Sequence, residues 1–262
     1  MSDDTGVTKE PAATVPQADS VKGFLHDKAK LAAYAVHMLT ACGGVLGLFA
    51  IMAASSGFTS RALWFLVAAV LIDAVDGTLA RRFSVSVHAP AVDGALLDNL
   101  VDFVTFVVAP AVLLFYTRLV PAPLAPCLAG LIVFCSAFQF SFHGAKTADH
   151  FFTGFPSYWN LAVLYLLLLE WHPWINAAIL LSLCALVFAP IKFIYPSRME
   201  FFSRSMLLKR LVLVATAGFG VLTVLLLWYY PARHPHLMNV ALLYMGLYVS
   251  LSVVRTVLDR PL

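Results

Sequence analysis

Residues 71–106 read LIDAVDGTLARRFSVSVHAPAVDGALLDNLVDFVTF, a stretch that joins two apolar segments through a short polar connection. Four of its five aspartates interrupt the apolar segments: Asp73 and Asp76 near the end of the first, Asp98 and Asp102 near the start of the second. Ionisable residues at membrane depth are rare because they are costly there, and they usually mark a functional site. The stretch therefore predicts two neighbouring membrane helices with a site between them.

The spacing of the aspartates predicts a shared metal site. Residues three or four apart lie on one face of a helix, which pairs Asp73 with Asp76 and Asp98 with Asp102. If the two helices pack side by side, four carboxylates converge and need cations between them. Oxygen ligands without His or Cys suit Mg²⁺ or Mn²⁺, and four carboxylates can hold a pair of such ions for phosphoryl chemistry. The alternative, that each aspartate is a helix cap or an interfacial solubilising residue, is disfavoured by the common register of all four.

The rest of the chain is apolar almost throughout. Apolar residues make up 61% of the 262 positions and charged residues 12%, and the mean hydropathy is +0.87, so the chain needs lipid as its solvent. The runs are continuously apolar, without the alternation of a β-barrel. The sequence predicts an all-α, polytopic membrane helical bundle of about eight transmembrane helices. The predicted spans are 31–55, 59–81, 95–117, 122–142, 157–171, 174–195, 208–229 and 237–256.

The N-terminal segment differs from this pattern. Residues 1–20 are polar and lack the apolar core of a signal peptide, which predicts a disordered tail. Residues 21–30 combine Phe24 and Leu25 with three lysines and predict an interfacial amphipathic helix. Residues 31–262 are then expected to form one membrane domain, in which small residues such as Gly43 and Gly44 permit close helix packing near the aspartates.

Lys and Arg are concentrated in the loops on one side of the predicted bundle. By the positive-inside rule this side is cytoplasmic, and an even number of spans places both termini there, together with the aspartates. The opposite side holds only Arg61, Arg118 and Arg233. The basic side holds Lys9, Lys22, Lys28, Lys30, Arg81, Arg82, Lys146, Lys192, Arg198, Arg204, Lys209, Arg210, Arg255 and Arg260.

The aspartates belong to a longer pattern, Asp73-x2-Asp76-Gly77-x2-Ala80-Arg81 followed by Gly94-x3-Asp98-x3-Asp102. This pattern resembles the signature of the CDP-alcohol phosphotransferase family. The connection between Arg81 and Gly94 is longer than in most members. This length, the chain length and the stretch from Phe142 to Asn160 resemble the bacterial phosphatidylcholine synthase branch. The resemblance implies a multi-pass enzyme of the bacterial inner membrane.

The resemblance also implies a reaction and residue roles. CDP-diacylglycerol would be the donor and CMP the leaving group, with Mn²⁺ or Mg²⁺ as cofactor. Asp102 and Asp98 would be catalytic, with Asp102 the general base. Because no activated Ser, Cys or His stands out, direct displacement is favoured over a covalent intermediate. Relatives are often homodimers, so an oligomer is expected, and no nucleic-acid partner is. The implied metal ligands are Asp73, Asp76, Asp98 and Asp102, and the implied CDP-lipid-binding residues are Asp76, Gly77, Ala80, Arg81 and Gly94.

The acceptor alcohol is less strongly indicated. Choline carries a fixed positive charge, which aromatic faces and carboxylates bind. The predicted choline-binding residues are Asp149, Phe155, Tyr158, Trp159 and Tyr195. Composition alone favours an aromatic belt at the membrane interface instead, and only the family resemblance points to choline. Serine is the leading alternative acceptor. A cation-coupled transporter is the alternative from another class, although no second aspartate motif appears in the C-terminal half.

Overall fold

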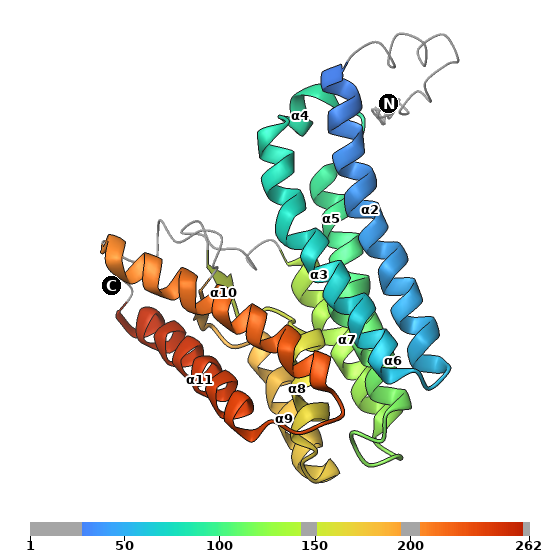
Figure 1. Cartoon of the computed structure of the whole chain (residues 1–262), viewed down its shortest axis with the longest axis vertical. Coiled ribbons are helices and arrows are strands. Elements are labelled where there is room, and N and C mark those ends of the chain that lie inside the picture. Colours follow the sequence, from blue (N-terminus) through green and yellow to red (C-terminus); the bar gives the residue numbers. More distant parts are fainter. Residues whose placement is uncertain (1–27, 143–150, 195–204, 259–262) are drawn as a thin grey trace, which may run out of the picture.

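The computed structural model describes residues 28–142, 151–194 and 205–258, and most of this part of the chain is helical (Figure 1). A two-residue antiparallel ribbon, β1 with β2, is the only sheet within these ranges. The elements in chain order are α2 (Lys28–Ser55), α3 (Thr59–Arg82), α4 (Val85–His88), α5 (Gly94–Asp102), the π-helix η1 (Phe103–Val108), α6 (Ala109–Tyr116), α7 (Ala125–Ser141), β1 (Phe152–Thr153), α8 (Trp159–Leu169), α9 (Pro173–Val187), β2 (Lys192–Phe193), α10 (Met206–Tyr229) and α11 (Pro235–Leu258).

Every predicted span coincides with a helix, which confirms the helical membrane bundle. Five helical segments are long and apolar enough to cross a bilayer: α2, α3, the continuous α5–η1–α6, α10 and α11. The other three, α7, α8 and α9, have only 17, 11 and 15 residues. They are shorter than predicted because α9 ends before Pro190, which cannot continue a helix, and α8 ends where Glu170 adopts a φ of 48°. The predicted N-terminal tail lies outside the described residues, and of the predicted interfacial helix only the last three residues are described, as the start of α2.

The core lies between the first six spans. Its largest cluster joins α2, α3, α6, α7, α8 and α9, and includes the fully buried Trp159 and Ile132. The last two helices, α10 and α11, pack as a pair on one side of this core (Figure 1). A smaller cluster of Tyr165, Met238 and Ala241 holds the pair to α8. Since α10 and α11 bury few residues, most of their surface is left for lipid.

The third span contains a π-helix directly after Asp102. In η1 the hydrogen bonds reach one residue farther than in an α-helix, as in the bond from the Ala109 N–H to the Val104 carbonyl. Pro110 follows at once, and it has no N–H to continue the α-helical pattern. A π-bulge accommodates such an interruption of the hydrogen-bond pattern, and π-bulges are frequent at functional sites. Here it changes the register of the helix beyond the second aspartate pair.

The loop that follows β1 contacts the end of α9 at a glycine. Gly154 has a φ of +80°, and its N–H donates to the Ile191 carbonyl at 2.9 Å. A Cβ at this position would lie 1.9 Å from the Val187 carbonyl oxygen. Both the backbone angle and the contact therefore require glycine.

We expect Gly154→Ala to destabilise the protein by about 1–3 kcal/mol, because it adds a strained φ and a collision with a rigid backbone. The measurement is thermal unfolding in detergent. Gly130→Ala is the matched control, because a Cβ there meets no atom within 4 Å. Equal melting temperatures for the two variants would contradict the role given to Gly154.

Candidate active site

Close packing of α2 brings the two aspartate-bearing helices together. Gly43 of α2 is buried, and a Cβ on it would lie 2.9 Å from Val101 Cγ1 and 3.9 Å from Ile72 Cγ2. These two neighbours precede Asp102 and Asp73 in the chain. The small-residue run of α2 thus sets the approach of α3 and α5 at the level of the aspartates, and the predicted close packing is confirmed.

Three of the four aspartates form one cluster. Carboxylate oxygens of Asp73, Asp98 and Asp102 all lie within 4.8 Å of one another, and each residue is half-buried. Three carboxylates this close repel one another when ionised, and a divalent cation relieves the repulsion. Their oxygen ligands fit Mg²⁺ or Mn²⁺. The arrangement agrees with the predicted metal site for these three residues.

Asp76 lies beside this cluster but is oriented differently. It is 5% exposed, and its Oδ2 accepts a hydrogen bond of 2.8 Å from the Thr40 hydroxyl of α2. It does not belong to the group of mutually close carboxylates. The structure thus brings three predicted ligands together and ties the fourth to α2, and metal ligation by Asp76 stays a prediction.

We expect Thr40→Val, which keeps the side-chain volume, to lower activity by about tenfold, because a buried carboxylate loses its hydroxyl donor. Activity at several Mn²⁺ concentrations is the measurement. Thr117→Val, at the other end of the bundle, removes a hydroxyl that bonds only its own helix at 2.7 Å and serves as control. A parental rate in Thr40→Val would show that the Asp76 orientation does not matter for turnover.

The glycines of the motif differ in what surrounds them. A Cβ on Gly77 would meet only Arg81 Nη1, at 3.7 Å, so α3 is open at this point. A Cβ on Gly94 would lie 2.8 Å from His37 Cε1. Arg81 is exposed, and its Nη2 donates to Thr78 at 3.2 Å. Ala80 packs, half-buried, against the small cluster of α2 and α4.

Two polar residues of α2 were missed by the sequence interpretation, which treated this span as apolar packing. His37 is buried beside Gly94, and its Nε2 has no hydrogen-bond partner among the described residues. Thr40, three residues later, bonds Asp76. Two polar side chains on one face of a span were the available signal, and it is the same signal that identified the aspartates.

The long connection between α3 and α5 folds as the short helix α4. Val85 and Ala89 are buried against Ala33 and Val36 of α2. At the start of α5, the Asp93 side chain accepts a hydrogen bond of 3.0 Å from the Leu96 N–H, a standard N-cap. The connection is therefore packed against α2, and it fixes the start of the helix that carries Asp98 and Asp102.

The predicted choline-binding residues fall into two groups. Asp149 and Tyr195 lie outside the described residues. Phe155 and Tyr158 are half-buried, whereas Trp159 is 0% exposed and its Nε1 donates to Ser136 at 2.7 Å. The role of all five in choline binding stays a prediction.

A buried polar network holds the loop of Phe155, Tyr158 and Trp159 (the aromatic loop) on α7. Ser157 donates to Gln139 Oε1 at 2.6 Å, and Gln139 Nε2 donates to the Phe155 carbonyl at 2.8 Å. Next to this network, the ring of Tyr158 lies 6.1 Å from the ring of Phe106 in η1. Because Phe106 is four residues after Asp102, the aromatic loop contacts the third span about one helical turn from the cluster.

Comparisons with known proteins agree with this site. The model of the CDP-alcohol phosphatidyltransferase family matches residues 33–191, more than half of the chain. A protein of Legionella pneumophila named phosphatidylcholine synthase is 38% identical over 86% of this chain and 89% of its own length. Proteins of the same name from Legionella bozemanae and Brucella melitensis are 39% and 32% identical, over 82% and 94% of this chain and 99% and 82% of their own lengths. The chain therefore belongs to the CDP-alcohol phosphatidyltransferase family.

Proposed function

We propose that the chain transfers the phosphatidyl group of CDP-diacylglycerol to choline and releases CMP. The observation that carries this proposal is the cluster of Asp73, Asp98 and Asp102, whose carboxylate oxygens lie within 4.8 Å of one another inside the region that the family model matches. The choice of choline is supported by the names of the relatives, which match most of the chain.

The three clustered carboxylates would hold the metal, with Asp76 as a fourth ligand after reorientation. When bound, a pair of Mg²⁺ or Mn²⁺ ions neutralises the pyrophosphate and stabilises charge on the departing CMP. Gly77 leaves the surface of α3 open, which lets the nucleotide approach the backbone. The exposed guanidinium of Arg81 is free to turn from Thr78 towards a phosphate, and it offers a rigid pair of donors.

Asp102 is proposed as the base that activates choline. The choline oxygen bonds to the phosphorus of the phosphatidyl group, the bond from that phosphorus to the CMP oxygen breaks, and the hydroxyl proton passes to the Asp102 carboxylate. Asp98, one turn earlier on α5, is proposed as a metal ligand that keeps Asp102 in position within the cluster. The half-buried position of both residues limits competing water.

The aromatic loop next to η1 is proposed as the choline site. Tyr158 and Phe155 are half-buried and can present ring faces to a quaternary ammonium group. Asp149 and Tyr195 are proposed to complete this site. The fully buried Trp159 would act by holding Phe155, whose ring centroid lies 5.1 Å away.

We further propose that the aspartate end of the bundle faces the cytoplasm of a bacterial inner membrane, as the distribution of Lys and Arg indicates. The acyl chains of the donor then stay in the adjoining leaflet. An oligomer, which the family resemblance implies, is expected as well.

The test is CMP release by the purified full chain with CDP-diacylglycerol and Mn²⁺ or Mg²⁺. Choline, serine, glycerol phosphate and no acceptor run in parallel. We expect choline alone to stimulate metal-dependent release. Stimulation by serine instead would keep the family reaction and reject the aromatic choline site. No release with any acceptor and either metal would reject the proposed activity.

A further inference from the structure

A cavity of about 410 Å³ lies at the end of the bundle opposite the aspartates. It forms where the α2–α3 turn, the end of α6 and the α8–α9 turn meet, at the bottom of Figure 1. The aspartates lie towards the other end of α3, near the connection to α5. The volume is in the range of small-molecule sites, so a ligand the size of a lipid head group fits it.

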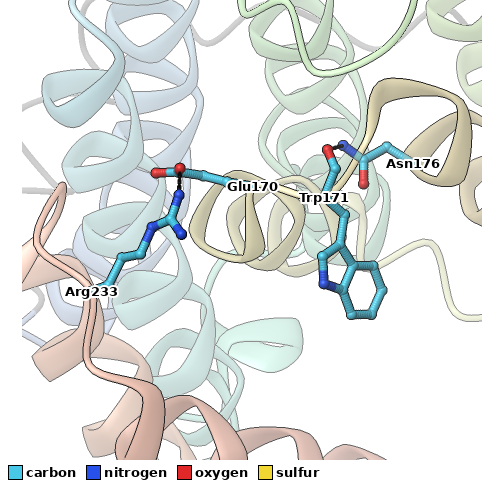
Figure 2. Close-up of polar contacts among 4 residues, drawn as sticks. All are labelled: Glu170, Trp171, Asn176 and Arg233. Atoms are coloured by element: carbon cyan, nitrogen blue, oxygen red, sulfur yellow. Dashed lines mark hydrogen bonds and ion pairs between the residues drawn. The ribbon is translucent and has the colours of Figure 1, made fainter.

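One wall of the cavity includes a buried amide with an unused acceptor. Asn176 is 1% exposed, and its Nδ2 donates to the carbonyls of Leu119 at 2.8 Å and Trp171 at 3.3 Å. Its Oδ1 has no hydrogen-bond partner among the described residues. Figure 2 shows the amide held against Trp171. Buried acceptors are nearly always paired, so this oxygen calls for a donor.

The charges at the cavity favour an anion. Glu170 lines it and forms an ion pair with Arg233 (Figure 2). Arg118 also lines the cavity, and within the described residues it has no ion-pair partner. Arg233 thus already neutralises the Glu170 carboxylate, and the Arg118 guanidinium remains available for a phosphate.

Aromatic side chains place this cavity at the membrane surface. Tyr116 and Trp171 line it and are exposed by 53% and 44%, and the neighbouring Trp174 and Trp228 are exposed by 61% and 71%. Exposed Trp and Tyr gather at the boundary between lipid and water. The phosphate most available at this depth is that of a phospholipid.

We propose that this cavity binds the head group of a phospholipid in the leaflet opposite the aspartate site. Arg118 binds the phosphate, and Asn176 Oδ1 accepts an N–H or O–H bond from the head group. Ethanolamine and glycerol head groups carry such donors, whereas a choline head group has none on its nitrogen. The site therefore prefers head groups other than choline. This inference is independent of the proposed reaction.

The experiment is titration of the purified full chain with dioleoyl lipids, with bound lipids counted by native mass spectrometry. We expect the phosphatidylethanolamine and phosphatidylglycerol forms to bind about tenfold more tightly than the phosphatidylcholine form, because only they satisfy the Asn176 acceptor. Arg118→Gln, at an exposed position, is expected to weaken binding of all three lipids by about tenfold, because each of them carries the phosphate.

Arg61→Gln is the matched control, because Arg61 is an exposed arginine at the same end that stacks on Phe58 at 4.5 Å and does not line the cavity. It should bind lipid like the parent. Equal binding of the three lipids, or equal loss in both arginine variants, would overturn the proposal. Competition with inorganic phosphate and with glycerophosphoethanolamine separates the sources: displacement by inorganic phosphate alone would assign the cavity to free phosphate and reject the head group.

Discussion

Asp102→Asn is expected to lower the rate of CMP release by about 10²–10⁴-fold while the chain stays folded. The substitution keeps the volume of the side chain but removes the carboxylate that would accept the proton of choline. It also removes one charge from a cluster whose oxygens lie within 4.8 Å of one another. Both effects act on the same step, so this is the largest loss that we expect from a single substitution.

Rates measured across a Mn²⁺ titration separate these two effects. A lower maximal rate with an unchanged half-saturating metal concentration indicates loss of the base, whereas a raised metal requirement indicates loss of a ligand. Asp93→Asn is the matched control, because Asp93 lies on the same helix, outside the cluster, and caps α5 by accepting the Leu96 N–H. Asparagine caps equally well, so the control should keep the parental rate. If Asp102→Asn does so too, the base is another residue.

Gly94→Ala is expected to lower activity by about 100-fold, because a small misplacement of reacting groups has effects of this size. The added Cβ would lie 2.8 Å from His37 Cε1, so either the imidazole or the start of α5 has to move. Movement of α5 displaces Asp98 and Asp102 relative to Asp73. The same methyl group would also reach the surface that the family resemblance assigns to the nucleotide.

Kinetics with varied CDP-diacylglycerol test this prediction, with Gly44→Ala as the control. A Cβ on Gly44 makes only an ordinary contact, 3.6 Å to Val101 Cγ2, so that variant should retain a rate close to the parent. The double variant His37→Ala with Gly94→Ala distinguishes the causes. Recovery in the double variant assigns the loss to the collision with His37, and no recovery assigns it to the nucleotide. Parental kinetics in Gly94→Ala would contradict both.

The membrane fold and the main site could be predicted from local sequence. Long apolar runs can only be helices in lipid, because each backbone polar group must be paired within its own segment. Aspartates three and four residues apart share a helix face whatever the tertiary structure is. For these reasons the spans, and the prediction that carboxylates of the second and third spans meet, were accessible without coordinates.

Other features depend on contacts between segments far apart in the chain. No sequence pattern indicated that Asp76 would bond Thr40, since the two are 36 residues apart and belong to different helices. His37 and Thr40 share a helix face in the sequence, but the contact between His37 and Gly94 depends on the packing of α2 against α5. The burial of Trp159 likewise follows from its bond to Ser136 of α7.

The sequence by itself determined that this protein lies in a membrane, that it is helical, and that neighbouring spans carry carboxylates on shared helix faces, because composition and helical periodicity are local properties. Only the tertiary structure decided which carboxylates meet, which one is held by α2, and that a polar cavity forms where separate turns converge. The physical reason is that close packing of helices depends on the shape of both partners, and the sequence of one helix contains only half of that information.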